Sequence, residues 1–293
     1  MTLKHLNIFA TVYKTLNITR ASEQLHMTQP AVSRAIQEIE HYYGRTLFDR
    51  MNHRLYHTEA GDELYSYAIH ILESFHHMEY AMKNQDPFGV LRIGSTMTVG
   101  NFLIPVINSH FQKKYPRLTL RTTVANGSYI QQALLDNMLD FAVMEDQVRS
   151  EYLMSEFLMT DNLCVISAPQ HPLCRQKEIR LADLIQYPLL LRENGSTARD
   201  LCNHIFALHE LPLDPLWEST STQALVKAVS LGIGISILPQ KIVTQDLCNE
   251  TICKHTIVDE PFARQWHIVR HKQKVLSPLV NEYIALCKKY TLA

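Results

Sequence analysis

The sequence predicts an α/β protein in which a helical head with a winged helix-turn-helix is joined by a long helix to a two-lobed domain. Three observations support this fold class. Apolar residues recur every three or four positions up to about residue 85, which is the period of a helix. From Val90 onward, short apolar runs alternate with helical segments, as in sheets covered by helices. The chain has 293 residues, of which 46% are hydrophobic and 19% charged, and this suffices for two packed domains.

The head begins with a helix over residues 2–16, for which Thr2 is a suitable N-cap. Its apolar face consists of Leu3, Leu6, Phe9, Val12 and Leu16. A short second helix, capped by Thr19, is expected to end near Leu25 and to be followed by a tight turn.

A third helix is expected between Thr28, its N-cap, and Gly44. Its buried stripe is expected to comprise Val32, Ile36, Ile39 and Tyr43. Two helices separated by a tight turn form a helix-turn-helix, whose second helix enters the major groove of DNA. Gln and Arg side chains can each make two hydrogen bonds to a base, although a merely solvated helix face has a similar composition. The residues expected to face DNA are Thr28, Gln29, Pro30, Ser33, Arg34 and Gln37.

A wing is expected after the third helix, with strands at 47–48 and 55–56 and a loop tip at 51–53. Positive charge at this wing would lie beside the phosphate backbone and increase affinity on any sequence. The residues assigned to this contact are Arg50, His53 and Arg54. Residues 1–54 carry seven Lys or Arg against four Asp or Glu, whereas residues 55–86 carry one against six. The head is therefore basic although the net charge of the whole chain is −1.

A long helix is expected over 58–85, broken by a hinge at 86–89. Its apolar residues follow a heptad spacing, which favours a dimer seam over packing in a globular core. The seam residues are Leu64, Ala68, Ile71, Phe75, Met78 and Met82.

The remaining residues predict two α/β lobes linked by two extended crossovers, near 159–166 and 265–271. Ligands in such folds bind at the carboxyl ends of the strands. Hydroxyl and amide groups at helix N-termini, together with an arginine, favour an anion there, although the same Ser and Thr residues could serve only as helix caps. The expected effector site comprises Ser95, Thr96, Met97, Thr98, Asn126, Glu145, Arg192, Ser196, Thr197 and Thr220.

The head resembles the winged helix-turn-helix of LysR-type transcriptional regulators. The resemblance rests on Thr28-Gln29-Pro30-Ala31-Val32-Ser33-Arg34, Leu47-Phe48-Asp49-Arg50 and Thr58-Glu59-Ala60-Gly61. Ser22, where the family usually has Ala, and Tyr56-His57 depart from the pattern. The second half is similar to the family's effector domain, a type II periplasmic-binding-protein-like fold, through Leu91-Arg92-Ile93-Gly94 and Gly232-Ile233-Gly234-Ile235.

This resemblance implies a homodimer, commonly a dimer of dimers, with a small-molecule effector between its lobes, and RNA polymerase is a further expected partner. Two-fold pairing implies that the protein binds double-stranded DNA at an interrupted inverted repeat. The N-terminus resembles neither a signal peptide nor a transit peptide, so we expect a cytoplasmic protein. The domains are then 1–58 for DNA binding, 59–89 for the dimerisation helix and hinge, and 90–293 for the effector. Lobe I comprises 90–161 and 267–293, and lobe II comprises 162–266.

Other classes receive less support from the sequence. It contains no catalytic or metal-binding motif, so we expect no catalytic residue, no metal and no cofactor. No apolar run is long enough to span a bilayer, and the six cysteines lack the spacing of a metal site, which favours reduced thiols. The alternative is a periplasmic-binding-like solute binder or enzyme with an N-terminal oligomerisation arm. The identity of the effector, the target genes and the direction of regulation are left open.

Overall fold

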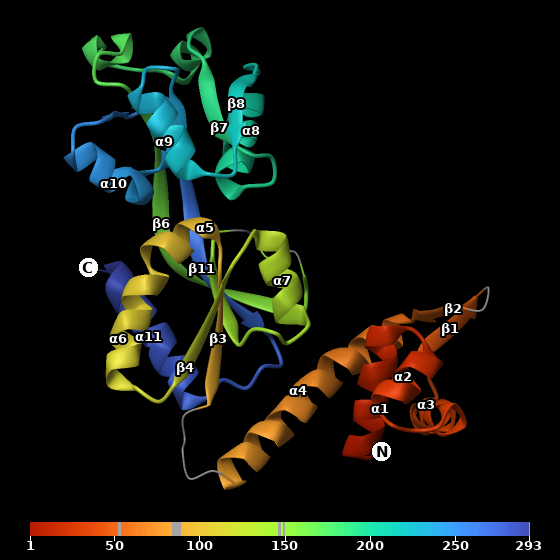
Figure 1. Cartoon of the computed structure of the whole chain (residues 1–293). Coiled ribbons are helices and arrows are strands. Elements are labelled where there is room, and N and C mark those ends of the chain that lie inside the picture. Colours follow the sequence, from red (N-terminus) through yellow and green to blue (C-terminus); the bar gives the residue numbers. More distant parts are fainter. Residues whose placement is uncertain (52–53, 84–88, 146–147, 149, 293) are drawn as a thin grey trace. The chain divides into compact units, whose positions relative to one another are not determined.

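The computed structural model describes all residues except 52–53, 84–88, 146–147, 149 and 293 (Figure 1). It contains two compact units. The first consists chiefly of residues 1–89 and includes two short segments, 135–138 and 271–275. The second holds the rest of the chain from Val90 onward.

The first unit is a helix-turn-helix followed by a hairpin and a long helix. Its elements are α1 (Leu3–Thr15), α2 (Ile18–Gln24), α3 (Gln29–Tyr43), β1 (Phe48–Met51), β2 (Arg54–His57) and α4 (Glu59–Lys83). Thr2 caps α1 as predicted, since its side chain accepts a hydrogen bond from the backbone N–H of His5. The N-cap of α2 is Asn17 and not Thr19, because the Asn17 side chain accepts from the N–H of Arg20.

The core of the first unit is formed by the inner faces of α1, α2, α3 and α4. Val32, Ile36 and Ile39 lie in it as predicted, and Ala35 joins them. Tyr43 does not, because 47% of its surface remains exposed at the end of α3. Gly44 ends α3 with a φ of 65°, the left-handed conformation that glycine adopts without strain.

The predicted wing is present as the antiparallel pair β1 and β2, in which Phe48 lies opposite His57 and Met51 opposite Arg54. The loop tip with His53 falls outside the described residues, as does most of the predicted hinge at 86–89. The side chain of Met82 in the predicted seam is likewise not described.

The second unit contains two α/β lobes (Figure 1). Lobe I is built from β3 (Val90–Ser95), α5 (Met97–Phe102), α6 (Ile104–Lys114), β4 (Thr119–Val124), α7 (Gly127–Leu135), β5 (Phe141–Met144) and α11 (Pro278–Leu292). Lobe II is built from η1 (Pro172–Arg175), η2 (Leu181–Gln186), β7 (Leu189–Arg192), α8 (Thr197–Leu208), β8 (Pro215–Ser219), α9 (Thr222–Ser230), β9 (Ser236–Pro239), α10 (Gln240–Cys248) and β10 (Cys253–His255).

Two long strands, β6 (Leu153–Ser167) and β11 (Ala263–His271), run from one lobe into the other (Figure 1). They are the two crossovers that the sequence predicted. In lobe I, β3 pairs in parallel with both β4 and β5, whereas β11 pairs antiparallel with β5. In lobe II, β7 and β8 are parallel, and β6 pairs antiparallel with β9 and β10. The strands that alternate with helices are therefore mostly parallel to one another, whereas the crossovers pair antiparallel with their neighbours.

Candidate functional site

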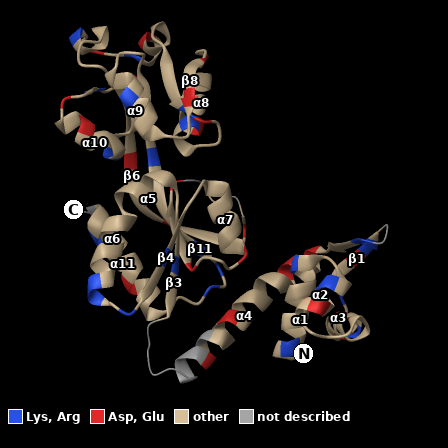
Figure 2. Ribbon diagram, in the orientation of Figure 1, with Lys and Arg blue, Asp and Glu red and all other residues tan. Residues whose placement is uncertain are grey.

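The first candidate site is the outer face of α3. Thr28, Gln29, Pro30, Arg34 and Gln37 are exposed, and Ser33 is half-buried. Thr28 is the N-cap, but its side chain makes no capping hydrogen bond, which leaves the hydroxyl available to a phosphate. Arg50 and Arg54, the described basic residues of the wing, are also exposed. Figure 2 shows the acidic residues along α4 and the Lys and Arg residues on the head.

A carboxylate on α3 fixes the position of the wing. Glu40 Oε1 accepts hydrogen bonds from the backbone N–H groups of Leu47, at 2.8 Å, and Phe48, at 3.3 Å. These are the residues that open the hairpin. The sequence alone assigned Glu40 no role.

A second cluster ties α1, the wing and α4 together. The Tyr13 hydroxyl donates to Asp62 Oδ1 at 2.6 Å, and His57 Nδ1 lies 2.8 Å from the same oxygen. The Tyr13 ring stacks on Tyr65 with the centroids 3.9 Å apart. Burial and the Asp62 hydrogen bond raise the pKa of Tyr13 well above its ordinary value, so the hydroxyl stays a donor. The head and the start of α4 therefore form one packed body.

The second candidate site is a cavity of about 320 Å³ between the lobes of the second unit. Nine of the ten predicted effector residues line it: Thr96, Met97, Thr98, Asn126, Glu145, Arg192, Ser196, Thr197 and Thr220. Ser95 does not, because its side chain is fully buried and donates to the carbonyl of Thr96. The sequence missed Glu193, Gly195 and Arg264, which also line the cavity.

Some of the predicted polar residues serve their own helices. The Ser196 hydroxyl accepts from the N–H of Arg199, and Asn126 Oδ1 accepts from the N–H of Tyr129. Thr220 does not cap α9, because Ser221 is the N-cap and its hydroxyl accepts from the N–H of Ala224. Helix capping therefore explains why Ser and Asn occur at these two positions. A ligand that bound Ser196 or Asn126 would do so while the side chain also capped its helix.

Arg192 reaches the cavity already paired. Its Nε and Nη2 atoms donate to the two carboxylate oxygens of Glu193 at 2.8 and 2.9 Å. Its Nη1 atom donates to the hydroxyl of Thr222 at 3.3 Å. The guanidinium is buried, so this neighbouring carboxylate offsets most of its charge.

Arg264, on β11, is the centre of a second ion cluster. Its Nε and Nη2 atoms donate to Asp161 Oδ2 on β6 at 3.0 and 2.9 Å. Nη2 also donates to the Thr98 hydroxyl at 2.8 Å and lies 3.4 Å from Glu145 Oε1. Both carboxylates are buried, and Arg264 thus joins the two crossovers to the wall of lobe I.

The formal charges that line the cavity cancel. Arg192 and Arg264 are matched by Glu145 and Glu193, and Asp161 lies behind Arg264. The positive polarity that remains for a ligand comes from the N-terminus of α8, whose first residues Thr197 and Ala198 line the cavity. The geometry therefore suits a polar molecule that both donates and accepts hydrogen bonds.

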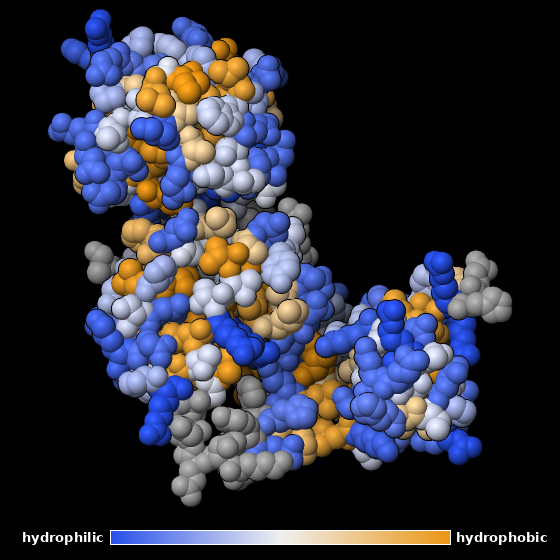
Figure 3. Space-filling view, viewed as in Figure 1, coloured by the Kyte–Doolittle hydropathy of each residue, from blue (hydrophilic) through white to orange (hydrophobic). Residues whose placement is uncertain are grey.

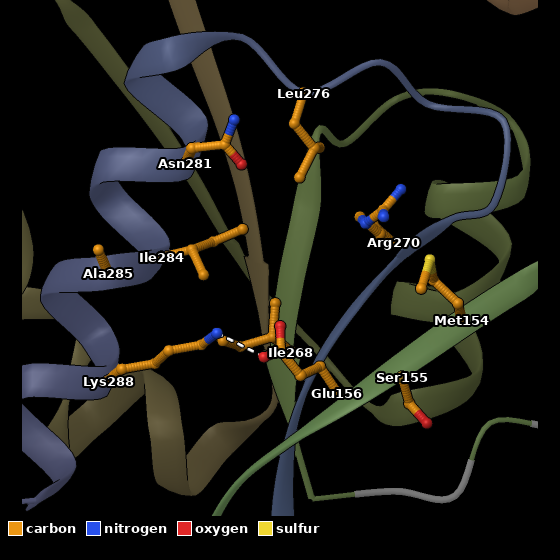
Figure 4. Close-up of a pocket in the computed structure, with 10 residues that line it drawn as sticks. All are labelled: Met154, Ser155, Glu156, Ile268, Arg270, Leu276, Asn281, Ile284, Ala285 and Lys288. Carbon is orange, nitrogen blue, oxygen red and sulfur yellow. Dashed lines mark hydrogen bonds and ion pairs between the residues drawn. The ribbon is translucent and has the colours of Figure 1, made fainter.

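A larger cavity, of about 420 Å³, lies wholly within lobe I (Figure 4). It is bounded by β6, β11 and α11, and Lys288 forms an ion pair with Glu156 across it. Only lobe I contributes to it, so a molecule bound there would not distinguish open from closed lobes. The cavity between the lobes is therefore the candidate effector site.

Within the described part of the chain, no helix is both long enough and apolar enough to cross a membrane. Among the same residues, no group of three or more His, Cys, Asp or Glu side chains is arranged to hold a metal ion.

Comparison with known proteins identifies the class. Residues 3–62 match the family model described as "Bacterial regulatory helix-turn-helix protein, lysR family", and residues 84–291 match "LysR substrate binding domain". The chain therefore belongs to the LysR family of transcriptional regulators. Regulators of this family bind DNA and small-molecule effectors and are oligomeric.

Individual relatives support the same family assignment. The chain is 31% identical over 287 residues to the uncharacterised HTH-type transcriptional regulator YeiE of Escherichia coli, covering 98% of this chain and 97% of YeiE. Among solved structures, a full-length OxyR variant from Pseudomonas aeruginosa matches with a TM-score of 0.68 at 21% identity, over 99% of this chain and 94% of that one. The regulatory domain of Synechocystis PCC6803 CcmR, solved in complex with 2-PG, matches with a TM-score of 0.64 at 24% identity, over 69% of this chain and 97% of that one.

These findings decide between the two classes that the sequence left open. The relatives are transcriptional regulators and not enzymes, which confirms the prediction that this chain is not an enzyme. The predicted family and fold class are confirmed as well.

Proposed function

We propose that this regulator binds a specific DNA sequence through α3 and the wing, and that a small anionic effector bound between the lobes controls it. The observation that supports this most is the cavity, in which residues from both lobes and from a crossover surround one space. A ligand that contacts both lobes binds the closed form more tightly and shifts the equilibrium towards it. A ligand with equal affinity for the open and closed forms would not change that equilibrium. As a regulator of transcription it would act in the cytoplasm.

The DNA half of the proposal rests on the exposed face of α3. Arg34, Gln29 and Gln37 point away from the core and have side chains that can read base edges. Arg50 and Arg54 would contact phosphates, which are the same on every sequence. His53, although outside the described residues, is proposed for the same role.

The effector half rests on the α8 N-terminus and on Arg192 and Arg264. An anionic group would take the helix dipole and compete with Glu193 for Arg192. The opposite wall offers Glu145, which suits a hydroxyl or ammonium group on the same molecule. The complex of the CcmR regulatory domain with 2-PG supports a small-molecule ligand in this domain type.

The quaternary proposal is a homodimer through α4, further assembled as a dimer of dimers. Two-fold symmetry then favours an interrupted inverted repeat, with half-sites separated by whole turns of DNA. Contact with RNA polymerase is part of the same proposal, for a protein that activates transcription.

The decisive experiment is a mobility-shift assay with the DNA next to the protein's own gene. Replacing Arg34 by Ala should weaken specific binding by about 1–3 kcal/mol and relax the preference at one base pair. Arg54→Ala should instead lower affinity for all sequences and reduce the salt dependence.

Arg121→Ala is the matched control, because it removes an equally exposed charge from β4 in lobe I. It should leave DNA affinity unchanged. Unaltered base preference in Arg34→Ala, measured by binding-site selection, would contradict the assignment of α3.

A further inference from the structure

The six cysteines fall into two groups. Cys164, Cys202 and Cys287 are buried, and burial raises the pKa of each to about 12, which makes these thiols inert. The other three are reachable from solvent: Cys174 and Cys248 are exposed, and Cys253 is half-buried. All six cysteines are free and three are buried, in agreement with the sequence prediction of reduced thiols.

Two of the reachable cysteines meet in lobe II. Cys253 begins β10 and lies opposite Ser167 in the antiparallel pairing with β6. Opposed residues of such a pair project from the same face of the sheet. Cys174, in η1, lies over that face, with its Sγ 3.6 Å from Ser167 Oγ. Both cysteines therefore lie beside Ser167, although they are far apart in the sequence, and burial and then the neighbouring Cys174 raise the pKa of Cys253.

A histidine completes the cluster. His255, two residues after Cys253 on the same strand, places Nε2 2.7 Å from Ser167 Oγ and 4.0 Å from Cys174 Sγ. Burial, and then the nearby His171, lower the pKa of His255, so its ring is neutral near pH 7. A neutral ring beside the thiols does not hold a standing thiolate as an imidazolium would. This favours slow thiol–disulfide exchange over a rapid reaction with peroxide.

We propose that Cys174 and Cys253 form a reversible dithiol–disulfide site whose co-substrate is a low-molecular-weight disulfide. Cys174, the more exposed thiol, loses its proton and attacks one sulfur of oxidised glutathione, and the departing glutathione thiolate takes up a proton. Cys253 then attacks Cys174 Sγ in the mixed disulfide and releases the second glutathione in the same way. The chain gives up two electrons and two protons, which reduce the glutathione disulfide to two thiols.

The proposal is tested on the reduced full-length protein incubated with oxidised glutathione. Intact-mass measurement should show the loss of two hydrogens from the chain, and peptide mapping should show Cys174 linked to Cys253. Dithiothreitol should reverse both changes. Cys248→Ser, which removes the third reachable thiol, is the matched control and should cross-link like the parent.

Cys174→Ser should abolish the cross-link, and its exposed position makes folding of this variant safe. Cys253→Ser should trap glutathione on Cys174 at an occupancy about tenfold above the parent, because the thiol that resolves the mixed disulfide is missing. Single glutathione adducts on Cys174 and Cys253 without a cross-link in the parent would overturn the proposal. A cross-link that involves Cys248 would overturn it equally, and neither measurement depends on DNA or on the effector.

Discussion

Among single residues, we expect Arg192 and Glu193 to decide which effector charge the cavity accepts. The two side chains are neighbours in sequence and pair through two hydrogen bonds at the cavity wall. An anionic ligand must compete with Glu193 for the guanidinium, whereas a neutral ligand need not. The charge of the effector can therefore be read from the behaviour of this pair.

Replacing Glu193 by Gln keeps the size of the side chain and removes the competing charge. We expect the affinity for a small carboxylate effector to rise about tenfold, or about 1.4 kcal/mol, and to fall by a similar factor in Arg192→Gln. The measurement is calorimetric titration with the tightest carboxylate found by thermal-shift screening. Glu218→Gln, which alters the partner of Arg199 outside the cavity, should change nothing. Equal affinities in the parent and Glu193→Gln would show that the effector does not use the Arg192 charge.

Arg264 has a different role, because it neutralises buried carboxylates. Replacing Arg264 by Met should lower the free energy of unfolding by about 3–5 kcal/mol, since Asp161 and Glu145 are left buried without their cation. Denaturant unfolding provides the measurement. Arg121→Met, at an exposed site, should cost less than about 0.5 kcal/mol. If both variants unfolded alike, the cluster around Arg264 would not contribute to stability.

The position of Arg264 in the pattern of β11 indicates a partnered charge, which the choice of site residues by residue type did not consider. Along β11, buried and exposed residues alternate at the start of the strand, and Arg264 occupies an inward position two residues before the buried Trp266. A charged residue at such a position requires a partner. For Ser196 and Asn126 the residue type alone was not sufficient, because helix capping and ligand binding favour the same residue types. Only the structure shows that both side chains accept hydrogen bonds from their own helices.

Among the secondary-structure elements, the long periodic helices of the head were predicted well, and two short helices of the second unit were missed. The helices at α1, α3 and α4 and the wing strands lie where periodicity placed them. The six-residue α5 and the nine-residue α10 were missed, because helices this short leave little periodic signal. The start of α2 was misplaced because Asn17 and Thr19 are both good caps, and the backbone used the earlier one.

The start of α4 depends on a close approach at Gly61. A Cβ added there would lie 2.4 Å from the backbone oxygen of Leu47, which is held in place by accepting from the N–H of Thr58. Gly61→Ala should therefore lower the free energy of unfolding by about 1–3 kcal/mol, although Ala is the better helix former.

Chemical denaturation checks this expectation. Ser74→Ala, at an exposed position of the same helix, is the control and should leave stability unchanged or slightly higher. A Gly61→Ala variant as stable as the parent would mean that α4 can shift away from the wing.

For the whole molecule, the exposed apolar side chains of α4 are the strongest sign of assembly. Figure 3 shows hydrophobic residues gathered along this helix, and Ile71 and Met78 of the predicted seam are about half exposed. Ala68 is instead fully buried in the core of the head, and Leu64 packs against that core. The seam proposed for the dimer thus narrows to the part of α4 beyond Ala68.

Ile71→Asp should split the dimer, because a charge in the seam loses its water without gaining a partner. We expect the free energy of dimerisation to weaken by about 2–4 kcal/mol. Sedimentation at micromolar concentration measures this directly. His76→Asp adds the same charge to an exposed position of α4 on the side away from the seam and should leave the dimer intact. An Ile71→Asp variant that remains dimeric would place the interface elsewhere.

Arg192 and Arg264 have different roles, and this difference affects how ligand preference can change during evolution. The Arg264 cluster is built into the strands that every arrangement of the lobes shares, so most substitutions there would reduce the supply of folded protein. Arg192 and Glu193 are adjacent in the sequence at the end of β7 and pair with each other. Neither of them neutralises a fully buried charge on another element, as Arg264 does. A lineage could thus acquire a new effector, or an engineer a new biosensor, through one or two changes at 192–193 while β6 and β11 stay unchanged.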